Sequence, residues 1–319
     1  AGEVSEERIN DAVRRILYVK KQLELWDNPV THYKGYDKFA SEEFQEASLN
    51  AAREGAVLLT NRDGFLPLDE DKRLLVTGPT AHSMVPLNGG WTYTWQGTET
   101  DSFAGSEQTV LEALQNTFKQ VEYVPGAGYH QEKDINKAKR AAQNADAVVL
   151  CLGESAYCET PGNIESLNLP EVQQKLAKTM AATGKPVVLL LLEGRPRIIR
   201  PFARDMEAVV LANLLGNKGG KALADIISGK VNPSGKLPYT YPRYCNALAT
   251  YRHKHTQHLP KPDGSPEFNP QYPFGHGLSY TTFAYSGLKL NKESLPMDGE
   301  LNVQITVKNT GDRAGKEAV

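Results

Sequence analysis

The chain lacks most of the features that would assign it quickly to a large class of proteins. Its 319 residues include only three cysteines, and its formal net charge is −2, with no basic block. No apolar run reaches the roughly 20 residues of a membrane-spanning helix, because the longest extends only from Pro186 to Leu192. We therefore expect neither a nucleic-acid partner nor a membrane partner.

Three cysteines cannot all pair within one chain, and they give no metal site. Cys151 lies inside an apolar run and is expected to be a small buried hydrophobic residue. Cys158 and Cys245 could form a disulfide, but their spacing gives no evidence for one, and no zinc-binding spacing is present. Phosphate-loop, nucleophile-elbow and zinc-protease motifs are also missing, which disfavours nucleotide binding and serine hydrolysis. We predict neither a metal nor a cofactor.

Short apolar runs alternate with amphipathic segments through the middle of the chain. Strands are predicted at 56–60, 74–77, 121–124, 147–152, 186–192 and 208–212, and helices at 107–118, 134–144, 171–182 and 221–228. Nearly continuous apolar strands separated by amphipathic helices predict a mostly parallel sheet of some five strands, covered on both faces. The predicted fold class is therefore α/β, a three-layer α/β/α sandwich.

Segments of a different character flank this region. A helix capped by Ser5 and ended by Asn28-Pro29 precedes it, and strands at 283–290 and 301–307 follow an irregular stretch rich in proline, glycine and tyrosine. We expect a helix and linker at 1–39, the sandwich at 40–244, a connector at 245–282 and the start of a small β module at 283–319. Both ends look cut, so we expect a piece of a longer polypeptide.

Two carboxylates follow the strand predicted at 147–152. Glu154 and Glu159 lie five residues apart in the next loop. In open α/β sheets, ligands bind beyond the carboxyl ends of the strands, and loops on rigid scaffolds often carry reactive groups. Partial desolvation there can raise the pKa of a carboxyl group, as a general acid requires. Glu154 could instead tie down loop backbone amides, and composition alone leaves both carboxylates as candidates.

A glycine-framed loop at 88–97 holds two of the three tryptophans, Trp91 and Trp95. Aromatic faces on such a loop suit stacking on a flat ligand such as a sugar ring. The alternative is that one ring fills the core and the other packs on a neighbouring domain. We favour core or interface for Trp91 and ligand contact for Trp95.

Two further segments are better explained by structural roles. In Glu193-Gly194-Arg195-Pro196 the Arg195 guanidinium could pair bidentately with a carboxylate, and we favour a structural ion pair. His276, in another glycine-framed cluster, could reach a site, but a packing role is preferred.

Taken in order, these motifs resemble the second domain of glycoside hydrolase family 3, the β-glucosidases and exo-β-glucanases, over almost the whole chain. The resemblance rests on segments 7–17, 53–61, 66–68, 194–196, 232–238 and 274–280. Segments 89–97 and 153–160 look most like the cereal-type exo-β-glucanases. The family fold implies a barrel-closing helix, then the α/β sandwich, then the start of a fibronectin type III-like β-sandwich.

The resemblance implies a retaining, exo-acting β-glycosidase that removes terminal β-linked glucose from oligosaccharides or glycosides. By similarity, Glu159 is the general acid/base and Trp95 lines the +1 sugar subsite; Trp91 and Glu154 are added as candidate substrate-binding residues. The family nucleophile is an Asp on an N-terminal TIM barrel, and none of the 319 residues is expected to supply it. The expected partners are therefore a β-linked oligosaccharide or glycoside and the TIM-barrel domain of the same polypeptide.

Several alternatives stay open. The chain could be a non-catalytic carbohydrate-binding or scaffolding module, or part of a β-xylosidase or β-N-acetylglucosaminidase of the same family. The family implies a periplasmic or secreted location, and the sequence leaves open whether the protein forms a homo-oligomer.

Overall fold

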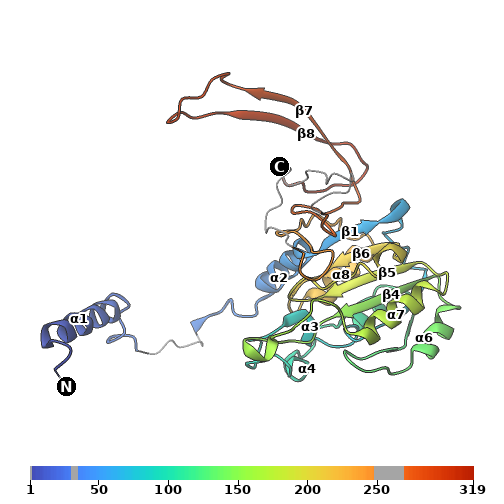
Figure 1. Ribbon diagram of the computed structural model, residues 1–319, viewed down its shortest axis with the longest axis horizontal. Coiled ribbons are helices and arrows are strands. Elements are labelled where there is room, and N and C mark those ends of the chain that lie inside the picture. Colours follow the sequence, from blue (N-terminus) through green and yellow to red (C-terminus); the bar gives the residue numbers. More distant parts are fainter. Residues whose placement is uncertain (1, 30–34, 248–268) are drawn as a thin grey trace. The chain divides into compact units, whose positions relative to one another are not determined.

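The computed structural model describes residues 2–29, 35–247 and 269–319 (Figure 1). It contains two compact units, residues 1–46 and residues 47–319, which are described separately. Much of the predicted connector, residues 248–268, lies outside the described residues, as does Tyr33 of the first linker. The predicted boundaries after residues 39, 244 and 282 stay predictions.

The first unit contains helix α1 (Glu6–Gln22) and the start of helix α2 (Glu42–Gly55). Ser5 caps α1 as predicted, because its hydroxyl accepts a hydrogen bond from the Arg8 backbone amide at 3.2 Å. The helix ends earlier than the predicted stop at Asn28-Pro29. Its apolar residues remain exposed within this unit, Ile16 for example at 58%.

The second unit is built on a six-stranded sheet in the order β1-β6-β5-β4-β2-β3. Five strands are parallel, and β1 at one edge runs antiparallel to β6. The strands are β1 (Val57–Asn61), β2 (Arg73–Thr77), β3 (Gln120–Tyr123), β4 (Ala147–Gly153), β5 (Val187–Leu192) and β6 (Ala208–Leu211). This confirms the predicted α/β class, and all six strands predicted for this region belong to one sheet, where some five parallel strands were expected.

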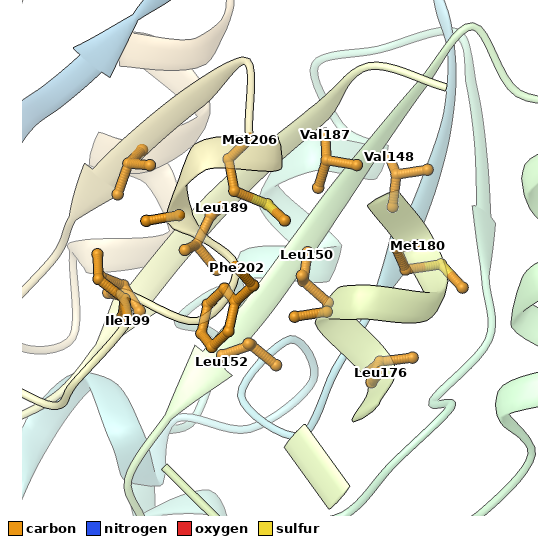
Figure 2. Packing of buried hydrophobic residues seen from close by; sticks show 14 of the residues in the cluster. Val148, Leu150, Leu152, Leu176, Met180, Val187, Leu189, Ile199, Phe202 and Met206 are labelled. Carbon is orange, nitrogen blue, oxygen red and sulfur yellow. The ribbon is translucent and has the colours of Figure 1, made fainter. Parts of the chain in front are cut away.

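Helices cover both faces of this sheet, which gives the three predicted layers. Alternate residues of β4 point to opposite faces: Leu150 and Leu152 belong to one buried cluster, and Cys151 belongs to the other. Figure 2 shows Leu150 and Leu152 between side chains of helix α7 (Glu171–Ala181) and the ring of Phe202. On the opposite face, helices α5 (Val110–Gln115) and α8 (Gly219–Ile227) cover the sheet through side chains such as Leu114 and Leu223. The core therefore fixes β4 on both sides.

Most predicted helices are present, with shorter bounds in several cases. The helices around the sheet are α3 (Val85–Asn88), α4 (Thr100–Phe103), α5 (Val110–Gln115), α6 (Ile135–Ala142), α7 (Glu171–Ala181) and α8 (Gly219–Ile227). α5 starts three residues later than predicted, because Thr109 and Glu112 form a capping box at its start. Pro170 directly precedes α7. Helices α3 and α4, in the segment that follows β2, were not predicted.

Strands β7 (Phe283–Leu290) and β8 (Val303–Asn309) pair as an antiparallel hairpin. Thus the strand predicted at 301–307 does have a partner within the chain. Within the described ranges, none of the helices is both long enough and apolar enough to cross a membrane.

Candidate functional site

The candidate site lies between two neighbouring parallel strands whose next strands along the chain lie on opposite sides of the pair. β2 and β4 are hydrogen-bonded neighbours; β3 lies beyond β2, and β5 lies beyond β4. Such a switch point leaves a crevice at the carboxyl ends of the strands, where open α/β sheets bind ligands. The Trp91 and Trp95 segment follows β2 in the chain, and the Glu154 and Glu159 loop follows β4.

Close approach of the chain after β2 to β4 requires glycine at one position. Gly78 has φ +113°, and a Cβ there would lie 2.0 Å from the carbonyl oxygen of Cys151. A side chain at this position would force the segments that follow the two strands apart.

The loop after β4, residues 154–163, is here called the carboxylate loop. Glu159 is exposed and has φ 53° and ψ −149°, just before the short 3-10 helix Thr160–Gly162. Non-glycine residues rarely adopt positive φ, and such strain costs about 1–3 kcal/mol and often occurs at functional sites. The desolvation expected for this carboxyl is not supplied by the residues described around it, because the side chain is exposed.

Glu154 has a different environment from Glu159. One of its carboxylate oxygens, Oε1, accepts hydrogen bonds from Arg195 Nε at 2.8 Å and from Arg197 Nη1 at 2.9 Å. Its side chain is only 9% exposed. The ion pair predicted for Arg195 is confirmed, whereas Glu154 is held by guanidinium groups rather than by the loop amides that we expected.

Arg195 also supports the far end of the carboxylate loop. Its guanidinium lies 3.9 Å from the ring centroid of Tyr157, and Nη1 donates to the carbonyl oxygen of Gly162 at 2.6 Å. A Cβ on Gly162 would come within 2.6 Å of that ring, and one on Gly194 within 2.8 Å of its hydroxyl. Burial, followed by the neighbouring charge of Glu154, raises the pKa of Tyr157 to about 12. The ring is therefore a neutral packing element of the loop.

A second carboxyl group, Glu193, is buried behind these arginines at 2% exposure. Its Oε1 accepts hydrogen bonds from Tyr241 Oη at 2.7 Å and from the Arg197 backbone amide at 3.3 Å. Its Oε2 has no partner among the residues that the structure describes. Burial, and then the charge of Glu154, raises the pKa of Glu193 to about 8. Sequence analysis gave no role to Glu193, although its position beside Gly194-Arg195 at a strand end was a usable signal.

The loop at 88–97, here called the aromatic loop, presents its rings outward. Trp91 is 69% exposed, Tyr93 52% and Trp95 51%. The Trp91 backbone amide donates to the Trp95 carbonyl at 2.9 Å, and Trp91 and Tyr93 have φ of 59° and 60°. Tyr93 is braced from outside the loop by Asn217, whose Nδ2 donates to the phenol oxygen at 2.9 Å. The core position considered for Trp91 is wrong, and an interface or ligand contact remains.

The aromatic and carboxylate loops are hydrogen-bonded to each other. The Cys158 backbone amide donates to Gln96 Oε1 at 3.2 Å, and Gln96 Nε2 donates to the Cys158 carbonyl at 3.3 Å. The Cys158 thiol donates to the Trp95 carbonyl at 3.1 Å. A Cβ on Gly90 would lie 2.5 Å from the Tyr157 carbonyl oxygen, so glycine allows this contact. The structure thus brings the residues beside Trp95 and Glu159 together.

A similar amide pair anchors the start of the carboxylate loop. Buried Gln173 of α7 accepts from the Gly153 amide and donates to its carbonyl, both at 3.0 Å. Neither Gln96 nor Gln173 was singled out from the sequence, because their partners are 62 and 20 residues away.

The remaining candidates have structural environments. All three cysteines lie in the described part of the chain and are free, so the disulfide considered between Cys158 and Cys245 is not formed; Cys151 is buried as predicted. His276 stacks on Tyr272 and its Nε2 contacts the Leu59 carbonyl at 2.7 Å, which confirms a packing role. Over the described ranges, no group of three His, Cys, Asp or Glu residues could hold a metal ion.

Several known proteins are similar to this chain in sequence or in structure. A Dictyostelium discoideum protein named lysosomal beta glucosidase is 36% identical over all of this chain and 41% of its own length. A Salmonella typhimurium protein named periplasmic beta-glucosidase is 30% identical over all of this chain and 46% of its length. The crystal structure of a beta-glucosidase from Listeria innocua in complex with glucose has 32% identity and a TM-score of 0.85, covering 98% of this chain and 44% of that one.

The chain therefore spans less than half the length of these relatives. Residues 56–280 match the model of the glycosyl hydrolase family 3 C-terminal domain, which covers the sheet, both loops and the ion pairs behind them. The chain belongs to glycosyl hydrolase family 3, through its C-terminal domain.

Proposed function

We propose that this chain supplies the general acid/base half of a retaining β-glucosidase, with Glu159 as the proton donor. The observation that carries the proposal is the pairing of the two loops at the switch point of the sheet. An exposed carboxylate on a strained backbone lies next to Cys158, which is hydrogen-bonded to the residues around exposed Trp95. Relatives and a solved structure named as beta-glucosidases support the choice of sugar.

In this proposal the second carboxylate comes from a TIM-barrel domain that docks on the crevice. Retaining glycosidases hold their nucleophile and their acid/base about 5–5.5 Å apart. Glu159 protonates the glycosidic oxygen as the nucleophile attacks the sugar, and it then deprotonates the water that releases the glycosyl-enzyme. Docking also supplies the desolvation that the exposed Glu159 side chain lacks in this chain.

The two tryptophans would bind the sugar beyond the cleaved bond. Trp95 is proposed to stack on the +1 sugar and Trp91 to contact either substrate or the docked domain, since both rings are exposed. Glu154 is proposed to act on substrate only indirectly, because its carboxylate is already paired with Arg195 and Arg197. A periplasmic or secreted location is proposed, in keeping with the relative named periplasmic.

The test is Glu159→Ala in the enzyme that contains this chain and its barrel domain. Turnover of cellobiose, whose leaving group needs a proton, should fall about 10²–10⁴-fold. Turnover of an aryl glucoside with an activated leaving group should fall far less in its first step. Glu165→Ala is the matched control, because it removes an exposed carboxylate six residues further along the chain. Unchanged turnover of cellobiose by Glu159→Ala would contradict the assignment.

A further inference from the structure

We infer that Gln96 is a positioning residue that sets the distance between the sugar-stacking ring and the proton donor. The inference rests on the proposed function, because it assigns Gln96 a role in placing Trp95 against Glu159. Gln96 directly follows Trp95 in the chain, and its hydrogen-bond partner Cys158 directly precedes Glu159. A single side chain therefore links the neighbours of both functional residues.

The Gln96 side chain binds both backbone groups of Cys158, one as an acceptor and one as a donor. The Gln96 amide oxygen accepts from the Cys158 N–H at 3.2 Å, while its nitrogen donates to the Cys158 carbonyl at 3.3 Å. A carboxamide can satisfy both groups of one residue at once, as a neighbouring strand does, whereas an ionised carboxylate, which only accepts, cannot. The Cys158 thiol adds a bond to the Trp95 carbonyl at 3.1 Å, and its sulfur accepts from Gln96 Nε2 at 3.2 Å, so four hydrogen bonds fix the register between the loops.

The carboxylate loop is held in the same way at its start. The bonds of Gln96 to Cys158 are therefore the second of two anchors on this loop. Gln173 makes the equivalent pair of bonds to Gly153 at the end of β4. Between Gly153 and Cys158 the chain is therefore fixed at both ends, and Glu159 leaves the second anchor with φ 53°. Strained backbone persists only where the surroundings hold it, and Gln96 supplies part of that restraint from outside the loop.

The first test measures the link itself and does not depend on activity. Gln96→Met keeps the length of the side chain and removes both amide bonds to Cys158. Hydrogen exchange of the Cys158 amide is expected to become about 5–10-fold faster, the usual effect of losing one backbone hydrogen bond. The control is Asn217→Ala, which removes the brace on Tyr93 and should leave exchange at Cys158 unchanged. Unchanged exchange in Gln96→Met would overturn the inference.

The second test measures leaving-group selectivity in the enzyme with its barrel domain. A proton donor displaced by about 1 Å can cost about 10²-fold in rate, so Gln96→Met should lower kcat/KM on cellobiose about 10–100-fold. On an activated aryl glucoside, kcat/KM should change less than about 3-fold, because it reports formation of the glycosyl-enzyme and that leaving group departs without a proton. Gln96→Asn, an amide shorter by one methylene, should give an intermediate loss and serves if Gln96→Met fails to fold.

The outcomes separate this inference from the proposed function. If the Cys158 amide exchanges faster in Gln96→Met but kcat/KM falls equally on cellobiose and on the aryl glucoside, Gln96 is purely structural. That result would overturn the inference. If Glu159→Ala leaves cellobiose turnover intact, the proposed function fails, whatever the exchange experiment reports.

Discussion

Replacing Glu193 with glutamine is expected to remove a large pH dependence from the stability of the protein. Burial, with the charge of Glu154 nearby, raises the pKa of the Glu193 carboxyl from its ordinary value of 4.5 to about 8. In the folded protein this group therefore keeps its proton through neutral pH, while in the unfolded chain it loses the proton near pH 4.5. The free energy of unfolding therefore falls as the pH rises.

The sign and size follow from proton linkage. Below pH 4.5 both states hold the proton, and the contribution of Glu193 to stability is fully present. Between pH 4.5 and 8 folding requires uptake of a proton, so the free energy of unfolding falls by about 1.4 kcal/mol per pH unit. The loss reaches about 5 kcal/mol by pH 8, where the folded-state group begins to ionise.

The assay is urea unfolding of both proteins at pH 5 and pH 8.5. Glu193→Gln keeps an amide oxygen that can accept the bonds from Tyr241 and from the Arg197 amide, and it does not titrate. The difference in the free energy of unfolding between the two proteins, which cancels other titrating groups, should shift by about 4 kcal/mol in favour of the variant between pH 5 and pH 8.5. Parallel pH profiles would refute the reasoning and would mean that the neighbouring arginines keep Glu193 ionised.

Two further predictions concern the loops. Gly90→Ala places a Cβ within 2.5 Å of the Tyr157 carbonyl oxygen and 2.8 Å of the Cys158 Cβ, so the free energy of unfolding in urea should fall by about 1–3 kcal/mol. Gly35→Ala is the control, because a Cβ there would have nothing within 4 Å. Equal stabilities of the two variants would contradict the close contact at Gly90. The chain without a barrel domain should bind cellobiose more weakly than about 1 mM by calorimetry, and a micromolar Kd would favour the carbohydrate-binding module instead.

The sequence predicted the sheet well because buried parallel strands are continuous apolar runs. β4 and β5 lie within one residue of the predicted strands, and both are fully buried. The antiparallel direction of β1 could not be read from its residues, because strand direction depends on the connection rather than on how apolar the strand is. The short helices α3 and α4 were missed because four residues are too few to display a helical period.

The candidate site was only partly predictable, because what distinguishes its residues comes from distant parts of the chain. Composition left Glu154 and Glu159 as equal candidates, and Arg195 and Arg197, about 40 residues further on, distinguish them by binding Glu154. The Gln96 link spans 62 residues and involves backbone groups, which leave no trace in the sequence. Short-range patterns predict elements, whereas loop-to-loop hydrogen bonds require the topology that brings β2 beside β4.

The most direct test of the central assignment is azide rescue of Glu159→Ala in the enzyme with its barrel domain. An activated aryl glucoside forms the glycosyl-enzyme without proton donation, and azide then replaces the water that Glu159 would activate. Added azide should restore turnover and yield β-glucosyl azide, the product with retained configuration. No rescue by azide, together with cellobiose turnover equal to that of the parent enzyme, would show that another group carries the proton.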